Sequence, residues 1–520
     1  MIFSNTPRPE TLKSLADVKH MPFWLDDPNR PEPASALTTS ITADLVVIGA
    51  GFTGLWTALI AKQANPTRDV VLLEAGETGF GASGRNGGFV ASSLTHSFQN
   101  GLNRWPKELN ERYRPRGKPR TLSSAASGGV LDPKGNKLIE LGHKNLDGIE
   151  ATIKQFNIDC DFIRSGEINV ANEEYQIDDL REETEHSAQY GEHIQFLDQE
   201  QVRARVNSPT YLAAIHDPSV AMVNPAQLVW GLRRACQEVG VRLFEGTQVT
   251  ALEEMRESVI VKTPRGQVES KKVALATNAF PPLLKRLSFY VVPVYDYVLM
   301  TEPLSKEQRD AIGWLGREGV GDYGNQFHYY RTTADGRILW GGYDAIYYRN
   351  NEVAPHLENR PASFARLAEH FFQTFPTLTG LRFTHAWGGV IDTCSRYTAF
   401  WGKAMHGKVA YALGYTGLGV GASRFGAQVM MDLLDDKKTE LTELQMVKSK
   451  PFPFPPEPFR SPIVNFTRWS LNRADDNQGK RNLWLKILDV LGLGFDSLLD
   501  FCSLEKEKPS GYVKRDWLAV

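Results

Sequence analysis

Cysteine is scarce in this sequence. Only 4 of the 520 residues are cysteines, and Cys160, Cys236, Cys394 and Cys502 are scattered along the chain. Zinc sites and iron–sulfur clusters need closely spaced cysteine ligands, so neither is expected and no metal is predicted. A disulfide framework is excluded for the same reason, and we expect free, buried thiols in a reducing compartment.

Long apolar runs are absent as well. No stretch reaches the ~18 apolar residues of a membrane-spanning helix, and the N-terminus lacks the basic and then apolar pattern of a signal peptide. These absences predict a cytoplasmic protein. The apolar stretch at 483–495 is expected to pack on the protein body. Contact with a membrane surface is the alternative, although the polar face of this stretch carries few charges.

Neither sign of charge is in excess. The chain has 59 Lys and Arg residues against 61 Asp and Glu residues, which gives a formal net charge of −2. It has no basic stripe with interleaved aromatic residues, so nucleic acid is not expected as a partner. With 42% hydrophobic residues, a chain of this length can bury a sizeable core, and two interleaved domains are expected.

A glycine motif stands near the N-terminus. The aliphatic run at 44–48 predicts a strand buried in a parallel sheet, and Gly49, Gly51 and Gly54 follow it with the spacing G-x-G-x-x-G. Gly49 permits a tight turn, Gly51 lets the backbone approach a pyrophosphate, and Gly54 lets the next helix, expected at 55–64, pack closely. The remaining positions of the motif include Phe52 and Thr53.

An acidic residue follows at the spacing that a dinucleotide requires. A second strand is expected at 69–73 and ends at Glu74, 20 residues beyond Gly54, with Ala75 next. A carboxylate placed there can accept both hydroxyls of an adenosine ribose. The strand, glycines, helix, strand and acid together predict an adenine dinucleotide site. The alternative is an ordinary βαβ unit whose glycines serve turn geometry only.

A second glycine-dense run at 79–88 favours FAD over NAD. It is too flexible for the interior of an element and too long for a turn, and its backbone N–H groups can surround a pyrophosphate and the edge of a flavin ring. The candidate cofactor-binding residues in this loop are Gly81, Ala82, Ser83, Arg85, Asn86, Gly87 and Gly88.

These motifs resemble those of the FAD-dependent amine and amino-acid oxidases, the D-amino-acid oxidase (DAO) family, over roughly residues 20–440. Within it, the sequence GASGRNGG at 81–88 is most similar to that of the γ-glutamylputrescine oxidase group. The resemblance implies a mixed α/β fold. A Rossmann-like FAD-binding domain with a parallel sheet carries an antiparallel-sheet substrate domain that roofs the flavin.

The resemblance also extends the cofactor site beyond the early motifs. It implies that Val249, in a strand expected at 247–252, reaches the adenine, and that small residues near Thr277 and Asn278 lie by the pyrophosphate. A late turn before a helix is implied to face the pyrimidine end of the flavin, where a helix N-terminus stabilises negative charge. The residues expected at this end are Gly389, Gly414, Thr416, Gly417, Leu418, Gly419 and Val420.

The chain departs from the family in two places. Sarcosine oxidases have Ser-Gly-His-Gly and a nearby lysine where this chain has Thr416-Gly417-Leu418-Gly419, which puts a carboxylate clamp of that type in doubt. Relatives with covalent flavin use a cysteine before this turn or a histidine in the early loop. An approximate register puts Trp387 at the cysteine position and Arg85 and Asn86 at the histidine position, so non-covalent FAD is predicted.

The expected domains alternate along the chain. An N-terminal arm (1–40) and FAD-binding segments (41–110, 224–282, 393–440) combine with segments of either domain (138–223) and a substrate domain (283–392). An exposed insert (111–137) and a C-terminal proline-rich and helical extension (441–520) complete the chain. Within the substrate domain, alternating residues predict antiparallel strands and a hairpin at 326–342 with its turn at 334–336.

Aromatic residues of the substrate domain are candidates for a pocket that excludes water and favours an uncharged amine. We expect Tyr297, Tyr330, Tyr343 and Trp387 there, with Arg331 available for a substrate carboxylate. For each of them, the alternative to substrate contact is a packing role in the core or at the surface. Further candidates are Tyr295, His328, Trp340 and Arg396.

The implied reaction takes a hydride from a C–H bond next to the nitrogen of an amine or amino acid. The imine that results hydrolyses, and O2 is reduced to H2O2. Two alternatives stay open. One is a D-amino-acid-type dehydrogenase that uses a quinone or another acceptor, and the other is a flavoprotein without catalytic activity.

Overall fold

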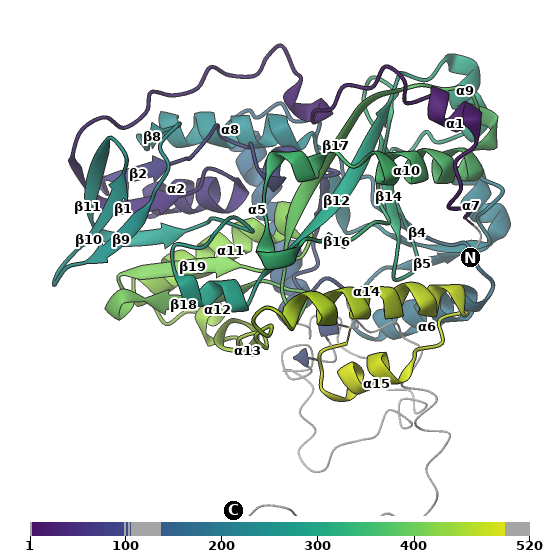
Figure 1. Ribbon diagram of the computed structural model, residues 1–520. Coiled ribbons are helices and arrows are strands. Elements are labelled where there is room, and N and C mark those ends of the chain that lie inside the picture. The colour runs from purple at the N-terminus through teal and green to yellow at the C-terminus, as the bar shows by residue number, and fades with distance from the viewer. Residues whose placement is uncertain (1–2, 98–99, 102–103, 106–136, 495–520) are drawn as a thin grey trace, which may run out of the picture.

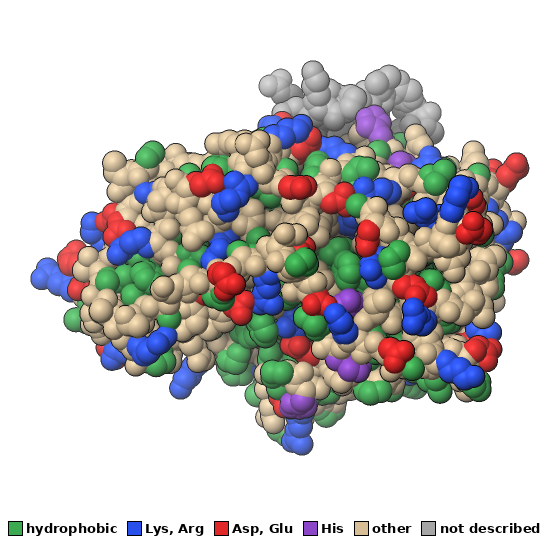
Figure 2. All heavy atoms as spheres, turned by 90° about the horizontal axis from the view of Figure 1, so that it is seen from above, with side chains coloured by type: hydrophobic (Ala, Val, Ile, Leu, Met, Phe, Trp, Pro, Cys, Tyr) green, Lys and Arg blue, Asp and Glu red, His purple; other side chains and the backbone are tan. Residues whose placement is uncertain are grey.

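The protein was analysed as a computed structural model that describes residues 3–97, 100–101, 104–105 and 137–494. It is built on two large sheets that lie side by side in Figure 1, with β12 and β17, two strands of the second sheet, near the middle of that view. The exposed insert expected at 111–137 lies outside the described residues, apart from Lys137. On the face seen in Figure 2, acidic and basic side chains are interspersed.

The first sheet carries the glycine motifs. Its strand order is β18-β19-β11-β1-β2-β8, with β9 and β10 added beside β11. The central pairs are parallel, as the continuous aliphatic runs predict, since such strands are buried on both faces. Its strands are β1 (Ile41–Ile48), β2 (Val70–Leu73), β8 (Arg242–Phe244), β9 (Ala251–Glu254), β10 (Val259–Thr263), β11 (Gly266–Leu275), β18 (Phe400–Ala404) and β19 (Val409–Leu413).

Helices cover this sheet. The largest hydrophobic cluster joins its strands to α2 (Phe52–Ala64), α5 (Lys137–Gln155), α8 (Pro225–Glu238) and α11 (Gly419–Leu434). Asn224 caps α8 by accepting hydrogen bonds from the N–H groups of Ala226 and Gln227, both at 3.1 Å. The strand expected at 247–252 was placed too early, because β9 begins only at Ala251.

The second sheet is largely antiparallel, with strand order β16-β12-β15-β14-β13-β4-β6-β5 and β17 paired with β12. The hairpin expected at 326–342 is β14 and β15. Its strands are β4 (Glu167–Ala171), β5 (Gln195–Leu197), β6 (Ala213–Asp217), β12 (Val292–Thr301), β13 (Gly319–Asp322), β14 (His328–Thr332), β15 (Ile338–Gly342), β16 (Ile346–Tyr347) and β17 (Phe383–Thr393). The helix α10 (Pro361–Thr374) buries its apolar face on this sheet. The predicted mixed α/β fold, with one parallel and one antiparallel sheet, is thus observed.

Smaller elements complete the fold. In Figure 1 the C-terminal helices α14 and α15 run along the lower side of the molecule, with α6 beside them in that view. No helix among the described residues is both long enough and apolar enough to cross a membrane. The remaining elements are α1 (Pro9–Lys13), β3 (Phe89–Ala91), α6 (Tyr175–Gln189), α7 (Gln199–Arg205), β7 (Val220–Met222), α9 (Lys306–Ile312), α12 (Glu440–Glu443), α13 (Gln445–Lys448), α14 (Arg460–Asp476) and α15 (Leu483–Val490).

Candidate active site

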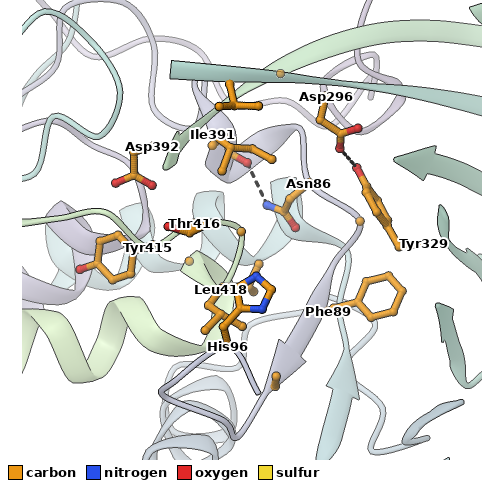
Figure 3. Close-up of a pocket in the computed structure, with 18 of the residues that line it drawn as sticks. Asn86, Phe89, His96, Asp296, Tyr329, Ile391, Asp392, Tyr415, Thr416 and Leu418 are labelled. Carbon is orange, nitrogen blue, oxygen red and sulfur yellow. Dashed lines mark hydrogen bonds between the residues drawn. The ribbon is translucent and has the colours of Figure 1, made fainter. Parts of the chain in front are cut away.

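One cavity of about 1120 Å³ extends between the two sheets. This volume slightly exceeds the roughly 300–1,000 Å³ typical of small-molecule sites, so a dinucleotide and a substrate can share it. Its lining combines the early glycine loop, the turn before α11 and the near faces of β4, β6 and β12. Residues far apart in the sequence therefore meet around a single space (Figure 3).

The first glycine motif forms one end of the cavity. Gly49 has a φ of 101°, and a Cβ there would lie 2.5 Å from the carbonyl oxygen of Ala276. A Cβ on Gly51 would lie 2.9 Å from Ser83 Oγ and would fill space between the two glycine loops. Gly54 is not among the lining residues, and a Cβ there would clash with the carbonyl oxygen of Gly49, so its role is close packing of α2.

Glu74 lies at the same end. Its Oε2 accepts a hydrogen bond of 2.7 Å from the N–H of Ala50, and its Oε1 accepts one of 2.9 Å from the N–H of Gly76. Burial raises the pKa of this carboxyl. Ala75 and Val249 line the cavity beside it. A half-buried carboxylate that faces the cavity fits the ribose of an adenosine group.

The second glycine loop carries 3₁₀ turn η2 (Ala82–Gly84) and is fixed from within. Ser83 Oγ accepts the N–H of Phe52 at 2.9 Å, and Asn86 Nδ2 donates to the carbonyl oxygens of Ala82 and Ser83 at 2.9 and 3.1 Å. Gly81, Ala82, Asn86 and Gly87 line the cavity. Gly88 does not, because it packs against the carbonyl oxygen of Val223.

Arg85 lines the cavity, but its charge is already balanced. Its side chain is only 7% exposed and forms an ion pair of 2.5 Å with Glu358. It also donates to the carbonyl oxygens of Phe80, at 2.7 Å, and Gly388, at 3.2 Å. The guanidinium thus ties the glycine loop to β17, and Gly389 on the same strand lines the cavity next to it.

The turn before α11 closes the cavity from the first sheet. Gly414, Thr416 and Gly417 have φ values of 78°, 50° and 95°, so the chain reverses sharply. A Cβ on Gly417 would meet no atom within 4 Å, so its backbone faces open space. Gly414 is not among the lining residues. The lining residues of this turn are Tyr415, Thr416, Gly417, Leu418, Gly419 and Val420.

This turn presents the N-terminus of α11 to the cavity, and Figure 3 shows Thr416 and Leu418 near Asn86 of the early loop. The N–H groups and dipole of a helix N-terminus favour negative charge, as the pyrimidine edge of a reduced flavin carries. The two glycine loops, the acidic residue and this turn together form a cradle that backbone atoms can line closely. The residues present therefore fit FAD, with Thr277 and Asn278 on the wall between the loops.

His96 is a lining residue that the sequence did not reveal. It lies beside Leu418 in Figure 3, and burial lowers its pKa. It stands in an irregular segment after β3, with a φ of 73°, so no strand or helix periodicity could point to it.

The structure brings only Tyr343 of the predicted substrate-pocket residues to the cavity. Tyr330 lies in the core, where its hydroxyl pairs with that of Tyr211 at 2.8 Å. Tyr297 lies in the same core and donates to the carbonyl oxygen of Leu357 at 2.9 Å. Successive side chains of a strand point to opposite faces, and both tyrosines stand on the face away from the cavity.

Trp387 and Arg331 also lie outside the described lining. Trp387 Nε1 donates to the carbonyl oxygen of Arg85 at 2.9 Å, so it supports the glycine loop from behind. Arg331 donates to the carbonyl oxygen of Val223 at 2.6 Å, and burial lowers its pKa to about 10. Neither group is placed to hold a substrate. The further candidates Tyr295, His328, Trp340 and Arg396 are also buried away from the described lining.

The neighbouring strand positions face the cavity instead. Asp296 and Val298 alternate with Tyr297 on β12, and Tyr329 precedes Tyr330 on β14. The Tyr329 hydroxyl donates to Asp296 Oδ2 (Figure 3). Burial raises the pKa of Asp296 to about 6. An acid–tyrosine pair therefore occupies the roof of the cavity, where isolated aromatic side chains were expected.

Comparison with known proteins bears on this site. Residues 44–433 match the family described as DAO, FAD dependent oxidoreductase. The chain is 31% identical over 440 residues to the gamma-glutamylputrescine oxidoreductase of Escherichia coli, which covers 83% of this chain and 92% of that protein. It is 28% identical over 430 residues to the probable oxidoreductase OrdL of Haemophilus influenzae, which covers 81% of this chain and 90% of that protein.

Solved structures share the fold at lower identity. Glycine oxidase from Geobacillus kaustophilus matches with a TM-score of 0.60 and 18% identity, over 79% of this chain and 100% of that one. L-Proline dehydrogenase from P. horikoshii matches with a TM-score of 0.60 and 18% identity, over 77% of this chain and 96% of that one. The resemblance expected from the glycine loops is confirmed by the family match, and the chain belongs to the DAO family of FAD-dependent oxidoreductases.

Proposed function

We propose that the protein oxidises a C–H bond next to the nitrogen of an amine or amino acid to an imine that water hydrolyses, with O2 reduced to H2O2. The observation that carries this proposal is the single cavity, in which the dinucleotide motif and the pair Asp296–Tyr329 face the same space. The names of relatives support the substrate class, since they include a gamma-glutamylputrescine oxidoreductase and a glycine oxidase.

The residues that would hold FAD follow from the site. Glu74 and Val249 would take the adenosine end, Gly51 and Ser83 the pyrophosphate, and the turn from Thr416 the pyrimidine edge. When bound, FAD would supply the acceptor for the hydride from the amine substrate. The protein's own contribution is to orient the amine, exclude water and remove a proton from its nitrogen.

Asp296 is the group proposed to accept that proton. An ammonium ion has no lone pair to support loss of a hydride from the adjacent carbon, so it must first lose a proton. A carboxylate with a pKa of about 6 is charged near neutral pH and still basic enough to accept it at Oδ1 or Oδ2. Tyr329, which donates to Oδ2, would orient the carboxylate.

Anaerobic mixing with a panel of amines and amino acids tests the proposal. At least one of them should bleach the flavin absorbance, and readmission of O2 should restore the absorbance with one H2O2 formed per substrate oxidised. Asp296→Asn should slow bleaching by about 10²-fold or more at neutral pH, whereas Tyr330→Phe, on the opposite strand face, should change it little. A flavin that no amine in the panel bleaches would overturn the proposal.

The alternative is that an acceptor other than O2 takes the electrons. Large apolar side chains are exposed on α14 and α15, where Trp469 is 51% exposed, Leu483 is 75% exposed and Val490 is 88% exposed. A surface of this kind favours contact with an apolar partner such as a quinone-bearing membrane. Turnover without H2O2 in air, together with rapid reduction of a soluble quinone, would assign the protein to this dehydrogenase class.

A further inference from the structure

The lining of the cavity is strongly acidic. Among its described lining residues are eleven carboxylates, against two arginines and no lysine. One arginine, Arg85, is paired with Glu358, and the other, Arg468, donates to the carbonyl oxygen of Ala345 at 3.2 Å. The carboxylates are Glu74, Glu167, Asp179, Glu183, Glu192, Asp217, Asp296, Asp322, Asp344, Asp392 and Asp475.

Four of these carboxylates gather on β4, β6 and α6, and are named here the acid end: Glu167, Asp217, Asp179 and Glu183. Glu167 and Asp217 are direct partners across the antiparallel pair β4–β6. Like charges that face each other across a sheet destabilise it. Asp179 and Glu183 are four residues apart on α6, so they share one face of that helix.

No carboxylate of the acid end forms an ion pair with another described residue. Asp179 is only 7% exposed, lines the cavity and has no hydrogen bond or ion pair with another described residue. The side-chain carboxylate of Glu167 likewise has no such partner in the described part of the chain. Glu183 accepts a hydrogen bond of 3.0 Å from the Tyr323 hydroxyl, and Asp217 accepts two from Ser219. The neighbouring Glu192 is balanced by His143 at 3.7 Å, so it is not counted with the acid end.

Asp179 is buried and Glu167 is half-buried. A carboxylate withdrawn from water without a partner is costly, and a ligand cation would remove that cost. A metal ion is a poor candidate, because the described residues include no group of three or more His, Cys, Asp or Glu side chains placed to hold one. Carboxylates spread over two strands and a helix suit an extended cation with several N–H donors. Tyr175 and Tyr323, which line the same region, add ring faces that attract ammonium groups.

We propose that the acid end is a subsite for a second cationic group, so that the substrate is a diamine or polyamine with a free distal ammonium group. The reacting amine would lie by Asp296 and the turn at Thr416, and the chain of methylene groups would pass below the second sheet to Glu167 and Asp179. This inference rests on the proposed amine oxidation, whose substrate class it narrows. It disfavours an α-amino acid, because eleven carboxylates against two arginines among the described lining residues would repel a substrate carboxylate.

A matched pair of amines tests the charge requirement. Butane-1,4-diamine and butylamine present the same primary amine to the flavin and differ in the distal ammonium. The diamine should have an apparent Kd, measured from anaerobic flavin reduction, at least about tenfold lower, since partly buried charge pairs contribute at least that much. N-Acetyl-butane-1,4-diamine, which is longer but lacks the second charge, should behave like butylamine.

Variants assign the effect to the acid end. Glu167→Gln and Asp179→Asn should each remove most of the diamine's advantage while leaving butylamine unchanged. Asp178→Asn is the matched control, because Asp178 is the exposed neighbour on the same helix. Its diamine Kd should equal that of the wild type.

Binding can also be measured without turnover. Enzyme reduced with dithionite cannot oxidise an amine, so calorimetric titration with butane-1,4-diamine and butylamine reports affinity alone. A diamine preference in this titration that Asp179→Asn abolishes supports the subsite even if no amine bleaches the flavin, which would overturn only the proposed oxidation. Equal affinity for the two amines, or a preference that survives both variants, overturns the subsite and leaves the oxidation standing.

Discussion

Asp392 and Gly414 are joined by a hydrogen bond of 2.6 Å, in which the N–H of Gly414 donates to Oδ2 of the carboxylate. The bond links the end of β17 to the start of the turn that closes the cavity. Burial raises the pKa of Asp392 to about 7, while hydrogen bonds from the backbone of Gly414, Tyr415 and Thr416 oppose that shift. One side chain thus holds the left-handed turn proposed to face the flavin.

Asp392→Ala is expected to weaken FAD binding. Loss of the Asp392 carboxylate leaves buried N–H groups of the turn without an acceptor, at a cost of about 1–3 kcal/mol. It also frees the backbone that would contact the flavin. We expect the Kd for FAD, measured by quenching of flavin fluorescence on titration of the apoprotein, to rise about tenfold or more. Asp392→Asn keeps one acceptor oxygen and should lose much less. Equal FAD affinity in Asp392→Ala and the wild type would contradict this role.

Gly51 provides a second test of the cofactor site. Its φ of −82° suits any residue, so Gly51→Ala should fold, but the new Cβ would lie 2.9 Å from Ser83 Oγ and enter the cavity. We expect the Kd for FAD to rise about tenfold while the melting temperature of the apoprotein changes by only a few degrees.

The double variant Gly51→Ala/Ser83→Ala separates two causes of this loss. It removes the clash between the side chains and keeps the methyl group in the space proposed for the pyrophosphate. FAD binding should stay weak relative to Ser83→Ala alone. Recovery to the level of that single variant would show that crowding of Ser83, and not contact with the cofactor, explains the effect.

The cofactor loops were predictable because their chemistry is local. A strand, a tight turn at Gly49 and an acid after the next strand can be recognised in a short stretch of sequence, and the structure sets them around one cavity. The faces of the second sheet were not predictable, because they depend on pairings between distant strands. The sequence pattern does not distinguish Tyr329 from Tyr330 as a pocket residue. The pairing of β14 in the sheet determines that Tyr329 faces the cavity.

The acid end illustrates the same limit. Glu167 and Asp217 become neighbours through the register of β4 and β6, 50 positions apart in the sequence. Asp179 joins them only when α6 packs on that sheet. A search for motifs finds no signal in such residues, because no fixed spacing connects them. His96 was missed for a related reason, since its position depends on how an irregular segment passes the turn at Leu418.

The carboxyls of the cavity should contribute a stability to the ligand-free protein that falls as pH rises from about 5 to about 7. Burial raises the pKa of Glu167 and Glu183 to about 7, and that of Asp179 and Asp296 to about 6. The folded state therefore keeps these protons to a higher pH than the unfolded state does. Since the unfolded state binds fewer protons in this range, the free energy of unfolding decreases with pH.

Melting temperatures across this pH range measure the effect. One pKa unit corresponds to ~1.4 kcal/mol, so a loss of at least about 1 kcal/mol is expected over the range. The double variant Glu167→Gln/Asp179→Asn should show a shallower slope, because two of the groups no longer titrate. Burial lowers the pKa of His96, His216, His370 and His385, which opposes this trend, so the slope difference is the test. A slope in the double variant as steep as that of the wild type would be incompatible with the raised pKa values of Glu167 and Asp179.

The flavin is expected to be released intact by acid. A covalent link needs a nucleophilic side chain at the ring, and no cysteine is among the described lining residues. Cys394 is fully buried, donates to the carbonyl oxygens of Thr398 and Gly414 at 3.1 and 3.4 Å, and has its pKa raised by burial. Precipitation with trichloroacetic acid should leave a colourless pellet and a yellow supernatant with the spectrum of free FAD.

His96 makes this prediction a demanding one. It is the single histidine among the described lining residues, it lies beside Leu418, and burial lowers its pKa, so its imidazole is neutral and able to act as a nucleophile. A yellow pellet would therefore mean that a covalent bond exists despite the register of Trp387, Arg85 and Asn86. Loss of that colour in His96→Ala, with no change in Cys394→Ala, would then locate the bond at the histidine. A colourless pellet from the wild type shows that His96 only packs against the cofactor, as the predicted non-covalent site requires.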